Sequence, residues 1–436
     1  MSGKANSPSP AAGATIAQKI IARAAGRHRV KPGELVTAAV DFAFAHDASG
    51  PRRWQPHMDR WGVGLWDPAK VAIVSDHYVP AADTASAEIL KLTREFADRH
   101  GVASFFDMVG ICHVVLPENG LIRPGAFVAG GDSHSPTGGA FGAYVAGYGA
   151  TDMLGIVTTG RTWLIVPQTI RVNIEGAFPA RVVAKDLMLI LCRELGMENS
   201  FTTIEFAGST VRAMPMLERM VLSNMAAELG ADTGIVEPDE VTFAYLRERG
   251  KPVEDEAAAS ALHSDADAGY AAVHTIDAAT LVPQVAAPHS PENIADAAHF
   301  ADVRIDQAYI GACVGAKLND LRMAARVLEG RKVADGVRLL VAPASAETYA
   351  RAAREGIITA LTEAGALMLP SGCGACAGLG AGVLAKGETC ISTTNRNFRG
   401  RMGDAGSAVY LASPYTVAAS AIAGRIVDPG EIMGDA

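Results

Sequence analysis

The stretch QAYIGACVGAKLNDLRMAARVLEG, residues 307–330, contains the pattern that decides the fold of this chain. It opens with an apolar run, typical of a buried parallel strand, that leads directly into Cys313. Apolar residues at Leu318, Leu321 and Ala325 then predict a helix that stops at Gly330. The stretch therefore predicts a strand, a turn and a helix, which is the repeating unit of an α/β domain.

The same alternation of strands and helices runs through the rest of the chain. Short apolar runs that end in small or polar residues recur as KVAIVSD, FVAGGD and RLLVAP, and longer helical patterns such as TASAEILKLTREFADRH lie between them. A chain of 436 residues is expected to divide into two or three such units. We predict a flexible tail at 1–14 and α/β domains at 15–170, 171–294 and 295–436, with a surface linker at 251–294.

The composition indicates a large folded protein without a nucleic-acid or membrane partner. Hydrophobic residues make up 49% and charged residues 19%, so the chain can bury a large interior. The net charge of −9 and the lack of a basic stripe argue against nucleic-acid binding. The apolar segment AVYLASPYTVAASAIAGRIV is expected to be a helix with Ser413 as N-cap, Pro414 at its first position and a stop at Gly424. The first fourteen residues resemble no signal or transit peptide, so we expect a soluble, cytoplasmic protein.

Three cysteines are candidates for a metal centre. The stretch LPSGCGACAGLG contains Cys373 and Cys376 as a C-x-x-C pair, but no second pair completes the four ligands of a structural zinc site. Cys313 follows a strand, so it can join the pair from a second loop. Three thiolates suit a [4Fe–4S] cluster with one open iron, which can act as a Lewis acid. The alternatives are a zinc ion with three cysteines and a water, or buried cysteines without a metal.

Histidines beside carboxylates form a second candidate set. The motif VAGGDSHSPTGG contains Asp132, Ser133 and His134 after a strand, IVSDHYVP contains the neighbours Asp76 and His77, and GICHVVLPE contains His113. One histidine beside a carboxylate is usually a structural pair. Several at strand ends instead favour a catalytic site, because the ends of parallel strands meet at one edge of a sheet.

Two arginines lie in the glycine- and asparagine-containing stretch STTNRNFRGRMG. Arg396 and Arg401 there are suited to holding a carboxylate through paired hydrogen bonds. The alternative is a solvated basic loop.

These motifs together resemble the aconitase family. GGDSHSPTGGAFGAY, CGACAG and STTNRNFRGRMG, with DHYVP and HVVLPENGLIRPG, follow the order of that family over nearly the whole chain from about Thr15. The chain is most similar to the large subunit of isopropylmalate dehydratase and related hydro-lyases. The resemblance implies three α/β domains around a [4Fe–4S] cluster. It also implies an enzyme that removes or adds water on a small hydroxy di- or tricarboxylic acid.

The resemblance further implies roles for particular residues. The implied cluster ligands are Cys313, Cys373 and Cys376. The implied catalytic pairs are Asp76 with His77, Asp132 with His113, and Glu205 with His134. The residues expected to bind substrate are Ser133, Arg396 and Arg401.

The chain departs from the family pattern in two places. Val314, Gly315 and Lys317 follow Cys313 where the family usually has Thr-Asn and then an arginine, which removes an amide and a guanidinium near the cluster. The chain also reaches Ala436 without the swivelling fourth domain that supplies a serine base and further arginines in single-chain aconitases. We therefore expect a separate small subunit and a heteromeric enzyme.

Two further interpretations remain open at this point. Within the same reaction class, the substrate could be citraconate, maleate or dimethylmaleate in place of an isopropylmalate-like acid. In another class, the same fold could sense iron or bind RNA after losing its cluster. The acidic charge and the retained cysteines, histidines and arginines count against that second interpretation.

Overall fold

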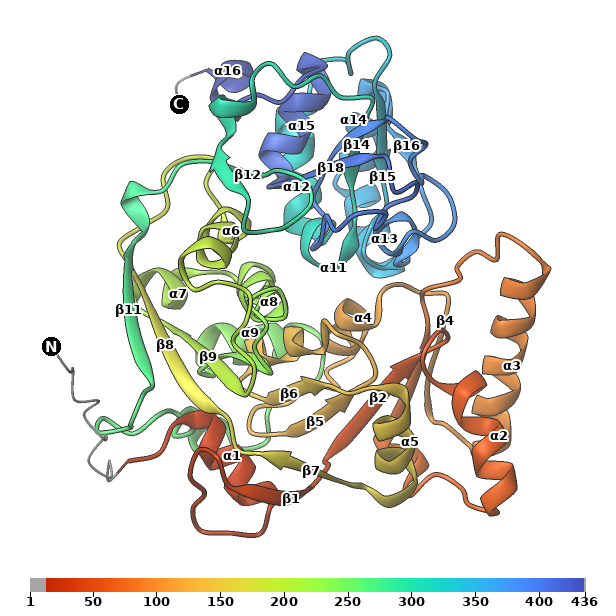
Figure 1. Cartoon of the computed structure of the whole chain (residues 1–436), viewed down its shortest axis with the longest axis vertical. Helices are drawn as coiled ribbons and strands as arrows, with labels where there is room; N and C mark the ends of the chain where they lie inside the picture. The colour runs from red at the N-terminus through yellow and green to blue at the C-terminus, as the bar shows by residue number, and fades with distance from the viewer. Residues whose placement is uncertain (1–12, 435–436) are drawn as a thin grey trace, which may run out of the picture.

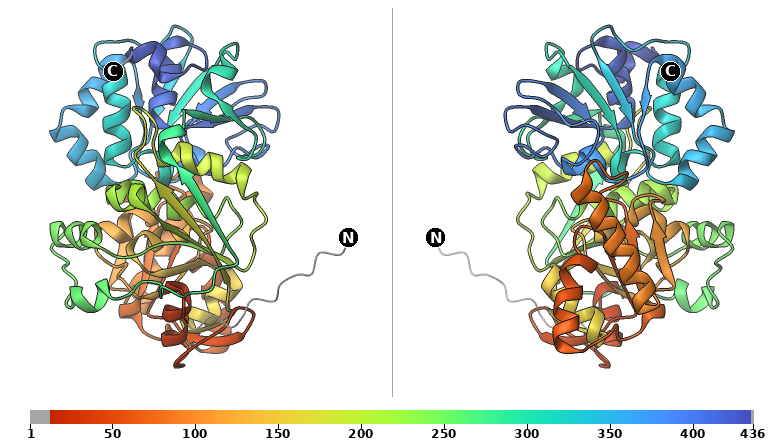
Figure 2. Two further views of the ribbon diagram at one scale, coloured as in Figure 1. Left: turned by 90° about the vertical axis from the view of Figure 1, so that its left-hand side faces the viewer. Right: turned by 90° about the vertical axis from the view of Figure 1, so that its right-hand side faces the viewer.

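The computed structural model describes residues 13–434, and these fold into three α/β domains, each built on a sheet whose strands are mainly parallel (Figure 1). In both side views the third domain, cyan to blue, lies above the first domain, red to orange (Figure 2). The predicted fold class is confirmed.

The first domain contains a five-stranded parallel sheet in the order β4-β3-β2-β5-β6. Its central strands β2 and β3 are buried along their whole length, as expected for a sheet covered on both faces. A two-stranded antiparallel ribbon, β1 with β7, lies beside it. The strands are β1 (Leu35–Ala39), β2 (Phe42–His46), β3 (Val71–Ser75), β4 (Ser104–Asp107), β5 (Phe127–Gly130), β6 (Tyr144–Gly147) and β7 (Arg161–Ile165). The helices are α1 (Ile16–Ala24), α2 (Pro51–Trp61), η1 (Pro68–Lys70), α3 (Thr84–His100), α4 (Cys112–Glu118), η2 (Ser135–Phe141) and α5 (Ala150–Thr159).

The second domain contains a four-stranded parallel sheet in the order β10-β9-β8-β11. Its strands are β8 (Gln168–Glu175), β9 (Thr202–Ala207), β10 (Thr233–Val236) and β11 (Ala272–Asp277). Its helices are α6 (Ala184–Glu194), α7 (Ser209–Ala213), α8 (Met216–Met225), α9 (Glu240–Glu248), α10 (Glu256–Ser260) and η3 (Ala278–Thr280). Helix α8 packs against η2 of the first domain, which joins the two domains next to the DSH motif.

The third domain contains a seven-stranded sheet in the order β13-β12-β18-β17-β14-β15-β16, in which β12 is antiparallel to both of its neighbours, β13 and β18, and the other pairs are parallel. Its strands are β12 (Gln284–Ala286), β13 (Ile294–Asp296), β14 (Gln307–Ile310), β15 (Arg338–Val341), β16 (Leu367–Met368), β17 (Thr389–Ser392) and β18 (Ala408–Ala412). Its helices are η4 (Ala297–Phe300), α11 (Ala312–Gly315), α12 (Leu318–Leu328), α13 (Ala346–Arg354), α14 (Ile357–Ala364), η5 (Gly374–Ala377), α15 (Pro414–Ala423) and α16 (Pro429–Met433).

Several local predictions are confirmed. The stretch at 307–330 forms β14, a short turn of helix and α12. Helix α15 begins after Ser413 with Pro414 at its first position, and it ends at Gly424 in the left-handed region at φ 69°. No helix among residues 13–434 combines the length and the apolar character required to cross a membrane.

The segment at 251–294 differs from the expected linker. It contains α10, and its strands β11 and β12 join two different sheets, so it forms part of two domain cores. The expected boundary at residue 170 lies inside β8. Residues 1–12 of the expected tail lie outside the described residues, and Ala14 donates its backbone N–H to Asp265.

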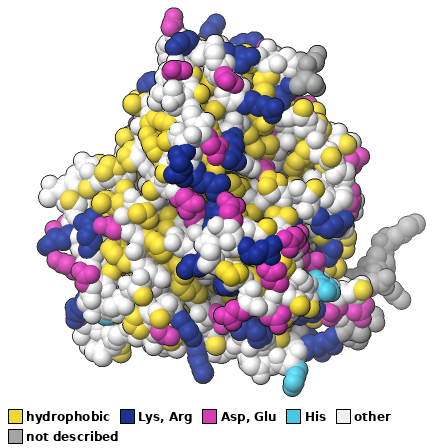
Figure 3. Space-filling model, turned by 180° about the vertical axis from the view of Figure 1, so that it is seen from behind, with side chains coloured by type: hydrophobic (Ala, Val, Ile, Leu, Met, Phe, Trp, Pro, Cys, Tyr) yellow, Lys and Arg dark blue, Asp and Glu magenta, His cyan; other side chains and the backbone are white. Residues whose placement is uncertain are grey.

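The back face of the molecule carries basic and acidic side chains that are interspersed (Figure 3). A protein that tracks a phosphate backbone needs lysines and arginines gathered into one field. The face seen in Figure 3 presents no such field, in agreement with the net charge of −9.

Candidate active site

Eight of the predicted site residues line one cavity between the first and third domains. Each follows the carboxyl end of a parallel strand, which explains why distant motifs converge. The predicted residues in its wall are His77, His113, Asp132, His134, Cys313, Cys373, Cys376 and Arg401. Asn395 lines the same cavity.

Asp132 lies at the centre of the histidine set. Its Oδ1 accepts hydrogen bonds from Nε2 of His113 at 2.7 Å and from the backbone N–H of His134 at 2.8 Å. Burial raises the pKa of Asp132, but His113 and the other histidines outweigh that effect and hold this pKa well below its usual range. Asp132 is therefore an ionised carboxylate, and the expected pair of Asp132 with His113 forms.

The expected pair of Asp76 with His77 also forms. Nδ1 of His77 is 2.6 Å from Oδ1 of Asp76, whose other oxygen accepts the backbone N–H of Cys112 at 2.7 Å. Burial lowers the pKa of His77, but Asp76, Asp132 and Asp47 together raise it to about 9. His77 is thus protonated at neutral pH and can donate a proton.

Two residues next to this pair were missed by the sequence analysis. The ring of His46 stacks on that of His77 with centroids 3.8 Å apart, and Asp47 accepts the backbone N–H groups of His77 at 3.0 Å and Tyr78 at 2.9 Å. The signal was present, because FAFAHD ends β2 as IVSDH ends β3. Neighbouring parallel strands place such ends side by side.

The expected pair of Glu205 with His134 is wrong. Glu205 lies within β9 and accepts hydrogen bonds from Arg171 at 2.5 Å, Ser264 at 2.6 Å and Tyr270 at 2.9 Å. These three partners occupy its carboxylate away from the cavity.

Glu228 takes the place that was expected for Glu205. Its Oε1 is 2.9 Å from Nε2 of His134 and accepts a hydrogen bond from Nε of Arg396 at 2.8 Å. Glu228 follows α8, and α8 packs against the η2 segment that begins directly after His134. Burial lowers the pKa of His134, but Glu228 and Asp132 raise it to about 9. No sequence motif marks Glu228, so only the packing of α8 identifies it.

Replacement of Glu228 by glutamine is expected to make activity more sensitive to alkaline pH. The raised pKa keeps His134 protonated below pH 9, so a function that needs this proton is present there and is lost as the pH rises through that value. Glutamine keeps the shape but removes the charge, so the loss should shift toward lower pH, with about tenfold lower kcat at about pH 8. The measurement is the pH profile of kcat.

Glu205→Gln is the matched control for this experiment. Because Glu205 binds Arg171 and not His134, its variant should lower the melting temperature but keep the alkaline limb of the profile unchanged. A profile that shifts in Glu205→Gln and not in Glu228→Gln would contradict the assignment.

The three candidate ligand cysteines come from two loops. Cys313 lies in α11 after β14, and the preceding Ala312 has a positive φ of 70°, a strained conformation for alanine. Nδ2 of Asn224 lies 3.1 Å from the sulfur of Cys313. Cys373 and Cys376 follow β16 around η5. A hydrogen bond from Cys373, together with the charge of Arg401, lowers the pKa of Cys376 to about 6 despite burial, whereas burial raises that of Cys313 to about 12.

This set of donors fits an iron–sulfur cluster. Thiolates are the usual cluster ligands, and amide donors near the sulfurs are the usual second contacts. A single zinc ion at about 2.3 Å from each sulfur would bring every pair of sulfurs within about 4.6 Å. Among the described residues, two groups of three or more potential ligand atoms lie mutually within 4.8 Å: His46, Asp47, Asp76 and His77, and His113, Asp132 and His134. The three cysteine sulfurs form no such group, so they are spread more widely than a single zinc ion requires.

The predicted substrate-binding residues lie at the same place. NH1 of Arg396 donates to Oγ of Ser133 at 3.1 Å, so these two residues touch each other across the domain interface. Arg401 lines the cavity, and its Nε is buried without a hydrogen-bond partner among the described residues. An N–H group of this kind can donate to a substrate carboxylate.

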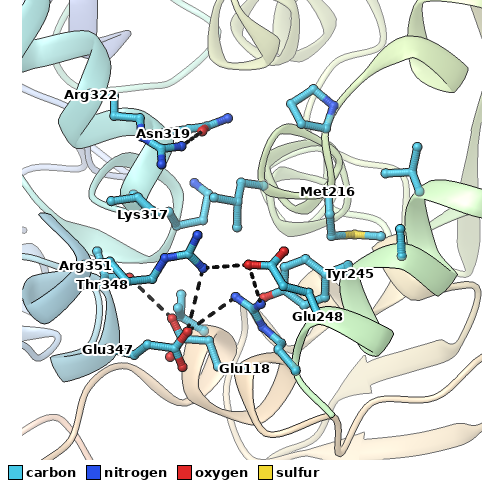
Figure 4. A pocket seen from close by; sticks show the side chains of 17 residues that line it. Glu118, Met216, Tyr245, Glu248, Lys317, Asn319, Arg322, Glu347, Thr348 and Arg351 are labelled. Atoms are coloured by element: carbon cyan, nitrogen blue, oxygen red, sulfur yellow. Dashed lines mark hydrogen bonds and ion pairs between the residues drawn. The ribbon is translucent and has the colours of Figure 1, made fainter. Parts of the chain in front are cut away.

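Lys317, one of the residues that depart from the family pattern, does not line the small cavity. Nζ of Lys317 donates to the carbonyl oxygen of Val314 at 2.9 Å and to Asp320 at 2.8 Å. Lys317 lines a second, larger cavity of about 370 Å³ (Figure 4).

Charged side chains in this second cavity pair with one another across two domains. Arg249 and Arg351 each lie between Glu248 and Glu347, at N–O distances from 3.1 to 4.0 Å. Figure 4 shows Arg351 between the two glutamates. None of the sequence-predicted catalytic or ligand residues lines this cavity. The catalytic groups therefore belong to the smaller cavity.

Protonated histidines fixed by carboxylates beside thiols and a half-buried arginine suit a hydro-lyase, an enzyme that removes or adds water. Comparison with known proteins assigns the family. The model described as the aconitase family (aconitate hydratase) matches residues 21–302 and 293–424, and the chain belongs to this family.

Relatives cover the chain almost completely. The 3-isopropylmalate dehydratase large subunit 1 of Methanopyrus kandleri is 46% identical over 96% of this chain and 99% of its own length. The probable methanogen homoaconitase large subunit of Methanothermobacter thermautotrophicus is 43% identical over 96% of this chain and 98% of its own. The solved structure of holo aconitase X from Thermococcus kodakaraensis covers 85% of this chain and 89% of its own, with 14% identity and a TM-score of 0.48.

Proposed function

We propose that this chain is the large, cluster-bearing subunit of a [4Fe–4S] hydro-lyase that dehydrates and rehydrates a 3-isopropylmalate-like hydroxy acid. The full-length similarity to 3-isopropylmalate dehydratase large subunits carries this proposal. The cavity supports it, because the residues that such a reaction requires meet there.

Cys313, Cys373 and Cys376 would hold the cluster. When bound, the cluster supplies a Lewis acid that polarises a substrate hydroxyl and carboxylate. Asn224 and Asn395 place amide groups near the sulfur of Cys313 and so orient this ligand.

The histidines would manage protons at defined atoms. Nδ1 of His77 is bound to Asp76, which leaves Nε2, 3.9 Å from Oδ2 of Asp132, to deliver a proton toward a departing hydroxyl. Nε2 of His134 is bound to Glu228 in the same way, which leaves Nδ1 on the side of Asp132 at 3.6 Å. The carboxylates keep both rings protonated and fix their orientation.

Arg396 and Arg401 would hold substrate carboxylates at the edge of the same cavity. Arg396 is fixed by Glu228 and Ser133, so its guanidinium is oriented before substrate arrives. A separate small subunit would supply the base that removes the carbon-bound proton. The name large subunit in the relatives supports such a partner.

The test is an anaerobic assay of the chain with the small subunit of an isopropylmalate dehydratase. The panel contains 3-isopropylmalate, citramalate, malate, dimethylmalate and homoisocitrate, which cover the citraconate, maleate, dimethylmaleate and homoaconitate alternatives. We expect the highest kcat/KM for 3-isopropylmalate and nearly none for the chain alone. A tenfold higher kcat/KM for another acid would assign that acid as the substrate in place of 3-isopropylmalate. Full turnover by the chain alone would refute the need for a partner.

A further inference from the structure

A fully buried lysine of the second domain lies beside the active site and takes no part in the chemistry described above. Lys185, in the first turn of α6, is 2% exposed. Its Nζ donates to the backbone carbonyl oxygen of Thr394 at 2.7 Å, in the loop after β17 of the third domain. The same loop continues through Asn395 and Arg396, which face Cys313 and Glu228.

The charge of this lysine is not balanced by a neighbouring carboxylate. Among the described residues its ammonium forms no ion pair within 4.0 Å, whereas Lys317, with 1% exposure, pairs with Asp320 at 2.8 Å. Transfer of an unpaired ammonium from water into a protein interior costs several kcal/mol. A buried ammonium group is either compensated by negative charge or has a lowered pKa.

The loop that Lys185 binds leads directly to the active site, because Nδ2 of Asn395 lies 3.6 Å from the sulfur of Cys313 and Nε of Arg396 donates to Glu228 at 2.8 Å. Burial lowers the pKa of Lys185 to about 8, and Glu228, followed by the thiols of Cys192, Cys376 and Cys313, opposes this shift. Two of these thiols are candidate cluster ligands. The contact of Lys185 with Thr394, the neighbour of Asn395, therefore places an ammonium group beside the loop that contacts Cys313.

We propose that Lys185 is a positioning residue that anchors the Thr394–Arg396 loop to the second domain and supplies a positive charge beside the three-thiolate site. This inference rests on the proposed function for the presence of the cluster. A nearby positive charge stabilises the reduced, more negative form of an iron–sulfur cluster. The anchored loop also fixes the guanidinium of Arg396 for substrate.

The experiment compares anaerobically reconstituted wild type with Lys185→Met, which keeps the length of the chain but removes its charge and its donor. A redox titration followed by electron paramagnetic resonance measures the midpoint potential of the cluster. We expect a more negative potential in Lys185→Met and a KM increased about tenfold with a smaller change in kcat. Lys185→Arg, which keeps the charge, should hold the wild-type potential.

The matched control removes a buried charge pair instead of a single charge. In Lys317→Met/Asp320→Asn the net charge is unchanged, so the potential should equal that of the wild type. If Lys185→Met does not fold, Lys185→Gln takes its place and the same shift is required of it.

Three outcomes would overturn the inference. These are an unchanged potential and KM in the neutral variant, an equal shift in Lys185→Arg, and an equal shift in the control. If the wild type is active and binds the cluster, each of these outcomes contradicts the proposed role of Lys185 and leaves the proposed function intact. A wild type that binds no cluster would remove the proposed function as well.

Discussion

Replacement of Cys376 by serine is expected to abolish activity and remove most of the iron from the protein. Wild type reconstituted without air should be brown, with about four irons and four sulfides per chain, and should lose one iron readily in air. The pKa of the Cys376 thiol is lowered, and Arg401 contributes to this shift, so the thiolate of Cys376 forms most easily. Its replacement removes one of the three candidate cluster ligands. Iron and sulfide analysis with the visible absorption spectrum measures the effect.

Cys390→Ser provides the matched control. Cys390 is equally buried, lies in β17 outside the cavity wall and has its sulfur 3.4 Å from the carbonyl oxygen of Ile391, which a serine hydroxyl can also approach. This variant should keep its iron. Colourless wild type with one zinc per chain after anaerobic reconstitution would contradict the cluster assignment, and so would a Cys376→Ser protein with full iron content.

Substitution of Arg401 by lysine is expected to lower kcat/KM by roughly one to three powers of ten, which corresponds to about 1.5–4 kcal/mol. Lysine keeps the charge but lacks the planar fork that makes two parallel hydrogen bonds to a carboxylate. Arg401 is suited to that role because it lines the cavity and its Nε has no hydrogen-bond partner within residues 13–434. Steady-state kinetics with the partner subunit measure the loss, and iron content shows that the site is intact.

Arg399→Lys is the control for Arg401, because Arg399 lies in the same loop and donates only to the backbone oxygen of Ala405 among the described residues. It should retain wild-type kinetics. Equal kinetics for Arg401→Lys and wild type, with an intact cluster, would show that Arg401 only stabilises the loop.

The predicted residues that meet in the small cavity follow strand ends or lie next to each other in the chain. Asp76 and His77 are neighbours, so their pair needs no long-range information. The stretch at 307–330 carries its own strand, turn and helix signals, and the fold class follows from the repetition of such stretches. The linker prediction at 251–294 failed because polar composition hides β11, whose exposed and half-buried residues alternate at the edge of its sheet.

The sequence by itself determined the α/β class, the three candidate cysteines, the histidine motifs and the two arginines, because local periodicity and short motifs encode each of them. Only the tertiary structure decided which groups meet. His134 and Glu228 are 94 positions apart, and Lys185 and Thr394 are 209 apart, so their contacts depend on how α8 and α6 pack between the domains. A glutamate inside a strand and one after a helix look equally suitable in a sequence, and packing alone gave Glu228 to His134 and Glu205 to Arg171.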